Sequence, residues 1–134
     1  MKYVLDASAC LAWILKEPGQ ARVLELLGTG DCLISSVNAA EVVSRLARLG
    51  HAESVLRQVV GHLRADCVSF DAAQATEAGV LREPTRHLGL SLGDRACLAL
   101  ARAQDAVAIT ADRAWLPLAE PLGIAIECIR HEAH

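Results

Sequence analysis

The chain opens with Tyr3-Val4-Leu5-Asp6-Ala7-Ser8-Ala9, a short apolar run that ends in an acid and continues into a helical pattern. Residues 3–5 predict a buried strand, and residues 8–16 predict a helix that ends before Pro18-Gly19. Further short apolar runs at 32–34, 67–70, 106–109 and 124–128 also predict strands. Because these strands are apolar throughout and separated by helices, we expect an α/β fold with a five-stranded parallel sheet covered on both faces.

The segments between the strands carry helical periodicity. Gly28 and Gly50 stand where helices should stop, and Pro84 could break a long helix. The segment that begins at Ser91 is apolar nearly all round, so we expect it to be a buried helix. After the first helix, the predicted helices cover residues 20–27, 37–49, 52–63, 71–87, 91–103 and 113–118.

Size and composition limit the functions that the chain can have. Its 134 residues, taken as 1–134, suit one domain, and its 53% hydrophobic content with 3% aromatics predicts an aliphatic core. The formal net charge is −3, which argues against a nucleic-acid binder that relies on a basic surface. A nuclease that gathers carboxylates around a cation can still be acidic, because the cation supplies the positive charge for phosphate.

Cysteine usage and the apolar segments indicate a cytoplasmic protein. The five cysteines are odd in number and contain no CxxC, so we expect buried free thiols in a reducing compartment. The N-terminus lacks the apolar region of a signal peptide, and the run 9–15 is far shorter than the roughly 20 residues that span a bilayer. The five histidines are scattered, so we expect them at the surface and disfavour chemistry that needs a histidine pair.

Four acids are placed near the predicted carboxyl ends of strands. Asp6 directly follows the first strand and Asp112 comes three residues after Ile109. Glu41 and Asp94 fall in the predicted first turns of two helices. In a doubly wound sheet, ligands bind outside the carboxyl ends of the strands. All four carboxylates are therefore candidates for one site.

Each acid also has a purely structural interpretation, because acids are common at helix N-termini. These alternatives are a cap of the first helix by Asp6 or Ser8, capping boxes at Asn38-x-x-Glu41 and Ser91-x-x-Asp94, an ion pair of Glu41 with Arg45, and a cap of the short helix by Asp112.

The four acids together point beyond capping. A buried carboxylate is costly unless it is paired or binds a metal, and Arg95 and Arg113 are the nearest basic residues in sequence. Oxygen ligands without cysteine or histidine suit a hard cation such as Mg²⁺ or Mn²⁺. Carboxylates with such a cation promote phosphodiester hydrolysis by activating water and neutralising the phosphate.

Four segments carry a resemblance to a known family. Residues 4–9 (VLDASA), 36–42 (SVNAAEV), 90–101 (LSLGDRACLALA) and 109–112 (ITAD) resemble the four acidic motifs of PIN domains, in order and at fitting spacing. Within that family the chain is most similar to VapC toxins, which are ribonucleases of toxin–antitoxin pairs. Gly93 stands where many relatives have alanine, a small-for-small exchange.

The resemblance implies an α/β/α sandwich and roles for the four acids. Asp6 and Asp94 would be direct ligands of Mg²⁺ or Mn²⁺. Glu41 and Asp112 would complete the cluster, directly or through water, and help to position the attacking water. The expected products are a 5′-phosphate and a 3′-hydroxyl, without a covalent intermediate.

The resemblance also implies supporting residues and partners. Thr110 and Ser8 could hydrogen-bond the ligand carboxylates, and Arg95 and Arg113 could contact RNA phosphates. The expected substrate is tRNA or another structured RNA. The expected assembly is a homodimer that is inhibited by a VapB-like antitoxin, with a peptide segment of the antitoxin inserted at the acidic site.

Two other functions remain open from the sequence. A Mg²⁺-dependent phosphatase of another α/β family would commonly use a DxD pair after the first strand, but here the pair is Asp6-x-Ser8 and no suitably placed lysine follows. A catalytically silent PIN-like module could keep the fold and bind RNA or protein, although the intact acids speak against it.

Overall fold

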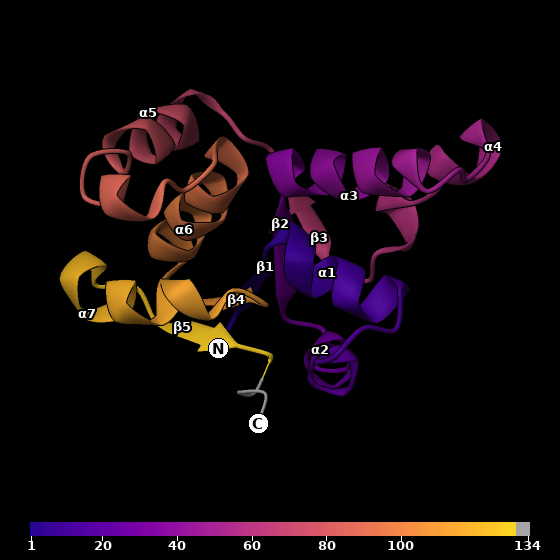
Figure 1. Ribbon diagram of the computed structural model, residues 1–134, viewed down its shortest axis with the longest axis horizontal. Coiled ribbons are helices and arrows are strands. Elements are labelled where there is room, and N and C mark those ends of the chain that lie inside the picture. The colour runs from indigo at the N-terminus through magenta and orange to yellow at the C-terminus, as the bar shows by residue number, and fades with distance from the viewer. Residues whose placement is uncertain (131–134) are drawn as a thin grey trace.

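The structure is a computed structural model that describes residues 1–130. Its centre is one five-stranded, fully parallel sheet in the order β3-β2-β1-β4-β5 (Figure 1). The predicted α/β class and the five parallel strands are thereby confirmed. The strands are β1 (Tyr3–Leu5), β2 (Cys32–Ser35), β3 (Asp66–Val68), β4 (Val107–Thr110) and β5 (Ile126–Cys128).

Helices connect consecutive strands and cover both faces of the sheet. The α-helices are α1 (Ala7–Ile14), α2 (Gln20–Leu27), α3 (Ser36–Arg48), α4 (Glu53–Leu56), α5 (Ala72–Val80), α6 (Leu92–Gln104) and α7 (Ala119–Leu122). Three 3₁₀ segments are η1 (Val60–His62), η2 (Arg86–Leu88) and η3 (Arg113–Leu118).

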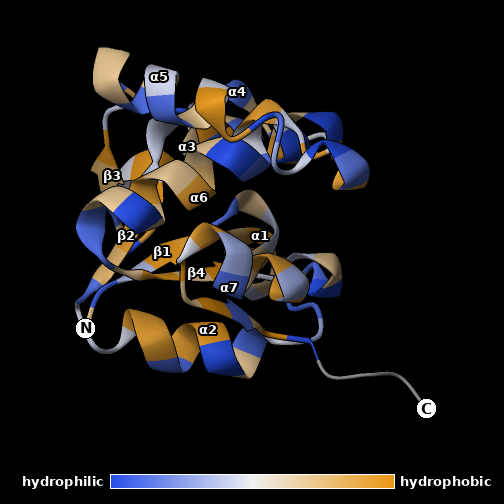
Figure 2. Ribbon diagram, turned by 90° about the vertical axis from the view of Figure 1, so that its left-hand side faces the viewer, coloured by the Kyte–Doolittle hydropathy of each residue, from blue (hydrophilic) through white to orange (hydrophobic). Residues whose placement is uncertain are grey.

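Alternating residues of β1 separate the two sides of the core. Val4 faces a cluster built from α5, α6 and η3, in which Trp115 is fully buried. Leu5 faces the opposite cluster, built from α1 and α2. Figure 1 shows α5 and α6 on one side of the sheet and α1 and α2 on the other. The molecule is therefore a three-layer sandwich, and in Figure 2 the apolar strands β1 and β4 lie between helices that carry hydrophilic residues.

Two predicted helices are shorter than expected. The segment 52–63 contains only the four-residue α4 and the 3₁₀ turn η1, and none of the residues in these two elements is buried. The segment 71–87 stops being α-helical at Val80 and continues through turns to η2. A short helix is marginal unless packing supports it, and both segments lie largely at the surface. Pro84 adds a local reason, because it cannot donate a helical hydrogen bond.

The cysteines and histidines differ in how far they are buried. All five cysteines are free thiols; Cys10, Cys32 and Cys97 are buried as predicted, but Cys67 on the edge strand β3 is exposed and Cys128 is partly buried. His51, His62 and His87 are exposed, while His131 and His134 lie outside the described residues. Among residues 1–130, no helix is both long and apolar enough to cross a membrane.

The strand order creates a switch point between β1 and β4. The chain runs from β1 to β2 on one side and later returns to place β4 on the other side, with Leu5 in register with both Ile34 and Ile109. Connections leave the carboxyl ends of such neighbouring strands in opposite directions, which opens a crevice there. Asp6 and Thr110 stand at this point of the sheet.

Candidate metal and active site

Asp6 is a buried carboxylate at the carboxyl end of the central strand. It caps α1, because its Oδ1 accepts a hydrogen bond from the Ala9 backbone N–H at 2.7 Å. The residue is only 4% exposed. Burial is the main reason that the pKa of Asp6 rises from 3.8 to about 6, against the opposing effect of its hydrogen bonds. The predicted capping role is confirmed, and it leaves room for a second role.

Two hydroxyl groups fix the Asp6 carboxylate, one from Thr110 at the end of β4 and one from Ser8 in α1. The Thr110 Oγ1 donates to Asp6 Oδ2 at 2.5 Å, and the Ser8 Oγ donates to Asp6 Oδ1 at 2.7 Å. Each hydroxyl also accepts from the backbone after β4, Ser8 from Ala111 and Thr110 from Asp112. The sequence predicted that Thr110 and Ser8 would hydrogen-bond a ligand carboxylate, and the geometry has both on Asp6.

Asp94 lies in the first turn of α6 and forms the predicted capping box with Ser91. The Ser91 Oγ accepts from the Asp94 N–H at 3.1 Å, and Asp94 Oδ2 accepts from the Ser91 N–H at 3.0 Å. The residue is partly exposed, while most of α6 behind it is buried, as expected for an apolar helix. Asp94 Oδ2 is used by the capping box, and Oδ1 accepts no hydrogen bond within residues 1–130.

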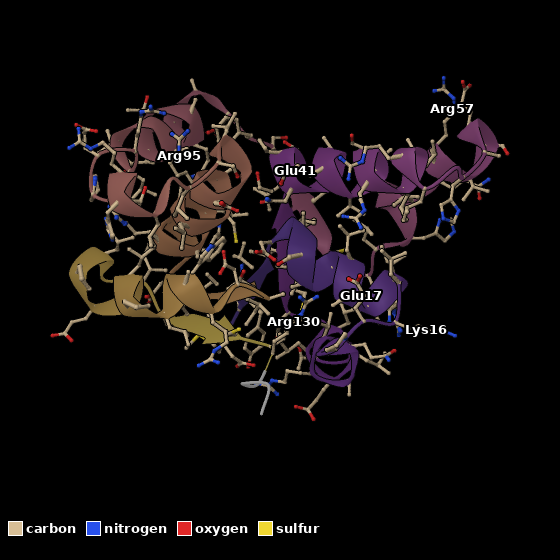
Figure 3. All side chains as sticks on the ribbon, viewed as in Figure 1. Lys16, Glu17, Glu41, Arg57, Arg95 and Arg130 are labelled. Atoms are coloured by element: carbon tan, nitrogen blue, oxygen red, sulfur yellow. The ribbon has the colours of Figure 1, made fainter. Side chains whose placement is uncertain are left out.

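Glu41 lies in the second turn of α3 and not in the first, because the helix begins at Ser36 with Ser35 as its cap. The proposed capping box at Asn38 and Glu41 is therefore wrong. Instead, the buried Asn38 Nδ2 donates to Glu41 Oε1 at 2.9 Å and to the Gly93 carbonyl of α6 at 3.0 Å. Figure 3 shows Glu41 at the end of α3 that faces α6.

Gly93 is more than a small residue exchanged for alanine. A Cβ built on Gly93 would overlap the carboxyl group of Glu41. The sequence analysis gave Gly93 no role, and it did not predict Asn38 as a residue of the site. The spacing Asn38-x-x-Glu41 was the available signal, but only the packing of α3 on α6 shows that the amide serves both helices.

Three of the four predicted acids lie near one another, because the Glu41 carboxyl group fills the space at Gly93, next to Asp94, and the charge of Asp94 acts on Asp6. Asp94 contributes to the raised pKa of Asp6 and also to the raised pKa of Glu41, for which burial is the larger cause. The pKa of the Cys97 thiol lies well above its usual range, mainly because the thiol is buried and also because the charges of Asp6, Asp94 and Glu41 act on it. Three acids that are far apart in sequence thus share one negatively charged region.

Asp112 stands at the same edge but is more exposed. It caps η3 by accepting from the Ala114 N–H at 2.9 Å, as the structural alternative predicted. Its own backbone N–H donates to Thr110 Oγ1 at 3.1 Å, which links it to the hydroxyl that holds Asp6. Arg113 follows at the surface as the first residue of η3.

The Arg95 side chain reaches from α6 to α5. Its Nη1 donates to the Ala78 carbonyl of α5 at 2.9 Å, and its Nε is buried without a hydrogen-bond partner among the described residues. Figure 3 places the side chain between α6 and α5. The prediction that Arg95 contacts RNA phosphates does not fit this geometry, because the guanidinium is used to join two helices.

The donor set fits a hard cation. The coupled groups are carboxylates, which Mg²⁺ and Mn²⁺ prefer, and burial makes the Asp6 charge costly without a positive partner. Within residues 1–130, no three His, Cys, Asp or Glu side chains are placed so that all could ligate one ion. Mg²⁺ usually takes one or two carboxylates and keeps several waters, so the absence of a three-ligand cluster in this part of the chain does not conflict with a site that uses Asp6 and Asp94.

A doubly wound parallel sheet with acids gathered at its switch point defines a class of α/β proteins with an acidic ligand site. The sequence model of the family described as PIN domain matches residues 3–120. This chain belongs to the PIN domain family.

Comparisons with individual proteins agree with the family. The chain is 28% identical over 113 residues to the tRNA(fMet)-specific endonuclease VapC of Shigella flexneri, covering 82% of this chain and 86% of that protein. Its fold is similar to DNA-bound VapBC of Salmonella typhimurium, with a TM-score of 0.73, 23% identity and coverage of 96% and 98%. VapBC2 of Rickettsia felis, bound to a promoter DNA fragment, gives a TM-score of 0.72 at 22% identity, with the same coverage.

Proposed function

We propose that this protein is a metal-dependent endoribonuclease, and that it is the toxin of a toxin–antitoxin pair in the cytoplasm. The observation that carries the proposal is the meeting of Asp6, Glu41 and Asp94 at the carboxyl edge of the sheet. Membership in the PIN family and the likeness to a VapC endonuclease support the same conclusion.

The acids would divide the work by their positions. Asp6, fixed by Thr110, Ser8 and α1, and Asp94, at the start of α6, would hold Mg²⁺ or Mn²⁺. A cation there supplies charge neutralisation at the phosphate and lowers the pKa of water. Glu41 and Asp112 would accept hydrogen bonds from water at the site and orient it toward the phosphorus.

The substrate that we propose is tRNA or another structured RNA, cut to a 5′-phosphate and a 3′-hydroxyl. Arg113 is exposed beside Asp112 and would contact a backbone phosphate. The similarity to a tRNA-specific endonuclease supports this substrate class. The net charge of −3 means that the cation and a few local arginines, rather than the whole surface, would attract RNA.

The partners that we propose are a VapB-like antitoxin and a second copy of the chain. Structural neighbours solved as VapBC complexes support the antitoxin. A peptide segment that offers an arginine to the acidic site would replace the cation and block cleavage. Light scattering of the purified protein tests the homodimer, and addition of the co-expressed antitoxin tests the inhibition.

The deciding experiment is cleavage of a mixed RNA pool by the wild type and by Asp6→Asn, with Mg²⁺ and with a chelator. We expect cleavage that needs Mg²⁺ and that the variant loses. Release of phosphate from small monoesters without RNA cleavage would indicate a phosphatase. Inactivity of both proteins, with RNA still bound, would indicate a silent binding module.

A further inference from the structure

We infer that Asn38 and Gly93 together form a seat that holds the Glu41 carboxylate in one position against the first turn of α6. The inference rests on the proposed function, because the seat matters for a site made of Asp6, Glu41 and Asp94. Neither Asn38 nor Gly93 is an acid, so neither would be a ligand. Both are positioning residues that act through Glu41.

Asn38 supplies the attractive half of the seat. The side chain is buried, and its amide nitrogen donates to Glu41 Oε1 at 2.9 Å and to the Gly93 carbonyl at 3.0 Å. An amide nitrogen has two hydrogens, so both are used, one on each helix. The Oδ1 of Asn38 is buried and has no hydrogen-bond partner among the described residues. The unpaired oxygen is a cost, and the cost fits a residue that is needed for its two donations.

Gly93 supplies the space. Its backbone does not have a positive φ, so the helical conformation does not require glycine at this place. Alanine would be the better helix former. The space that a Cβ would take is instead filled by the carboxyl group of Glu41. The glycine therefore lets the carboxylate approach the backbone of α6 one residue before Asp94.

The seat restricts the conformations of the Glu41 side chain. Glu41 is on the exposed side of α3, and a glutamate there would normally sample several rotamers. A carboxylate that must orient water needs a fixed place, and functional side chains reach that precision only when neighbours lock them. One hydrogen bond from Asn38 and one missing methyl group on Gly93 give Glu41 this fixed place.

The test uses the full chain with Asn38→Ala, Gly93→Ala and the double variant. Thr85→Val is the matched control, because Thr85 is also buried and hydrogen-bonded, but to the Leu81 carbonyl beyond α5. The measurements are Mn²⁺ affinity by electron paramagnetic resonance, RNA cleavage over a range of Mg²⁺ concentrations, and thermal unfolding. A crystal structure of Gly93→Ala reports where the carboxylate of Glu41 lies.

We expect each single variant to lower Mn²⁺ affinity or the cleavage rate by about 10-fold or more, as when residues that orient ligands are removed. Gly93→Ala should melt no lower than the wild type, because alanine favours the helix. Its crystal structure should show Glu41 displaced. The double variant should lose no more Mn²⁺ affinity or cleavage rate than the more impaired single variant, because both changes release the same carboxylate.

The seat is refuted if both single variants stay within twofold of the wild type, or if their losses multiply in the double variant. A failure of Asn38→Ala to fold leaves Gly93→Ala to decide. Asp6→Asn separates this result from the proposed function. If Asp6→Asn binds Mn²⁺ and cleaves RNA like the wild type, the assignment of the active site to Asp6 fails as well, whereas a loss in Asp6→Asn alone refutes only the seat.

Discussion

The hydroxyl of Thr110 donates to the carboxylate of Asp6 at 2.5 Å and joins two side chains that are 104 residues apart in sequence. The bond connects the ends of β1 and β4, which are neighbours only because of the strand order. The same hydroxyl accepts from the backbone N–H of Asp112. One threonine therefore holds a buried acid and the start of the loop that carries a second acid.

Thr110→Val keeps the shape of the side chain and removes both hydrogen bonds. Because the hydroxyl orients a predicted metal ligand, we expect Mn²⁺ affinity and RNA cleavage to fall by about 10- to 100-fold. Titration calorimetry and a cleavage assay measure the two quantities. Thr85→Val is the control for loss of a buried hydroxyl, and an equal loss of activity in that variant would show a general effect on folding.

Asp6→Asn should stabilise the metal-free protein near neutral pH. The pKa of Asp6 is raised to about 6 in the folded state, so that state keeps the proton better than the unfolded chain. The free energy of unfolding therefore falls as pH rises from 3.8 to 6, and above pH 6 it is lower by up to about 3 kcal/mol. Asparagine does not ionise, so the variant keeps this stability.

Urea unfolding of the wild type and Asp6→Asn at pH 4 and pH 7.5 tests the expectation. The stability difference should be small at pH 4 and should favour the variant at pH 7.5. Asp71→Asn is the control, because Asp71 caps α5 in the same way but is exposed. A wild type that is the more stable protein at pH 7.5 without metal would contradict a costly buried charge.

Asp112→Asn separates capping from chemistry. Asparagine caps helices about as well as aspartate, so η3 should keep its start and the protein should unfold within about 0.5 kcal/mol of the wild type. If Asp112 orients water, the cleavage rate should still fall by about 10-fold or more while Mn²⁺ affinity falls less than in Asp6→Asn. Unchanged cleavage would leave Asp112 with the cap of η3 as its only role.

Arg95→Gln tests whether the arginine binds RNA or holds helices together. Loss of its bond to the Ala78 carbonyl should lower the free energy of unfolding by about 1–3 kcal/mol. The salt dependence of RNA binding should stay the same. Loss of a phosphate contact would instead lower the salt slope by about 1, which is the result that we expect for Arg113→Gln.

Much of the fold could be read from patterns along the chain. Residues 3–5 and 32–34 are apolar without alternation because both faces of a central parallel strand are covered. Helix boundaries were predictable where a cap marks them, as Ser91 and Asp94 do for α6. The segments 52–63 and 71–87 were overestimated, because a helical pattern does not reveal how far along the segment packing supports the helix.

The site divides in the same way. The places of Asp6 after a strand and of Asp94 at the start of a helix could be predicted from the sequence, since they depend on local hydrogen bonding and on the direction of the strands. The contacts of Asn38 and Gly93 with Glu41, and the turn of Arg95 toward α5, are visible only in the folded protein. The contacts of α6 with α3 and α5 depend on how closely the helix backbones approach each other, which no local pattern encodes.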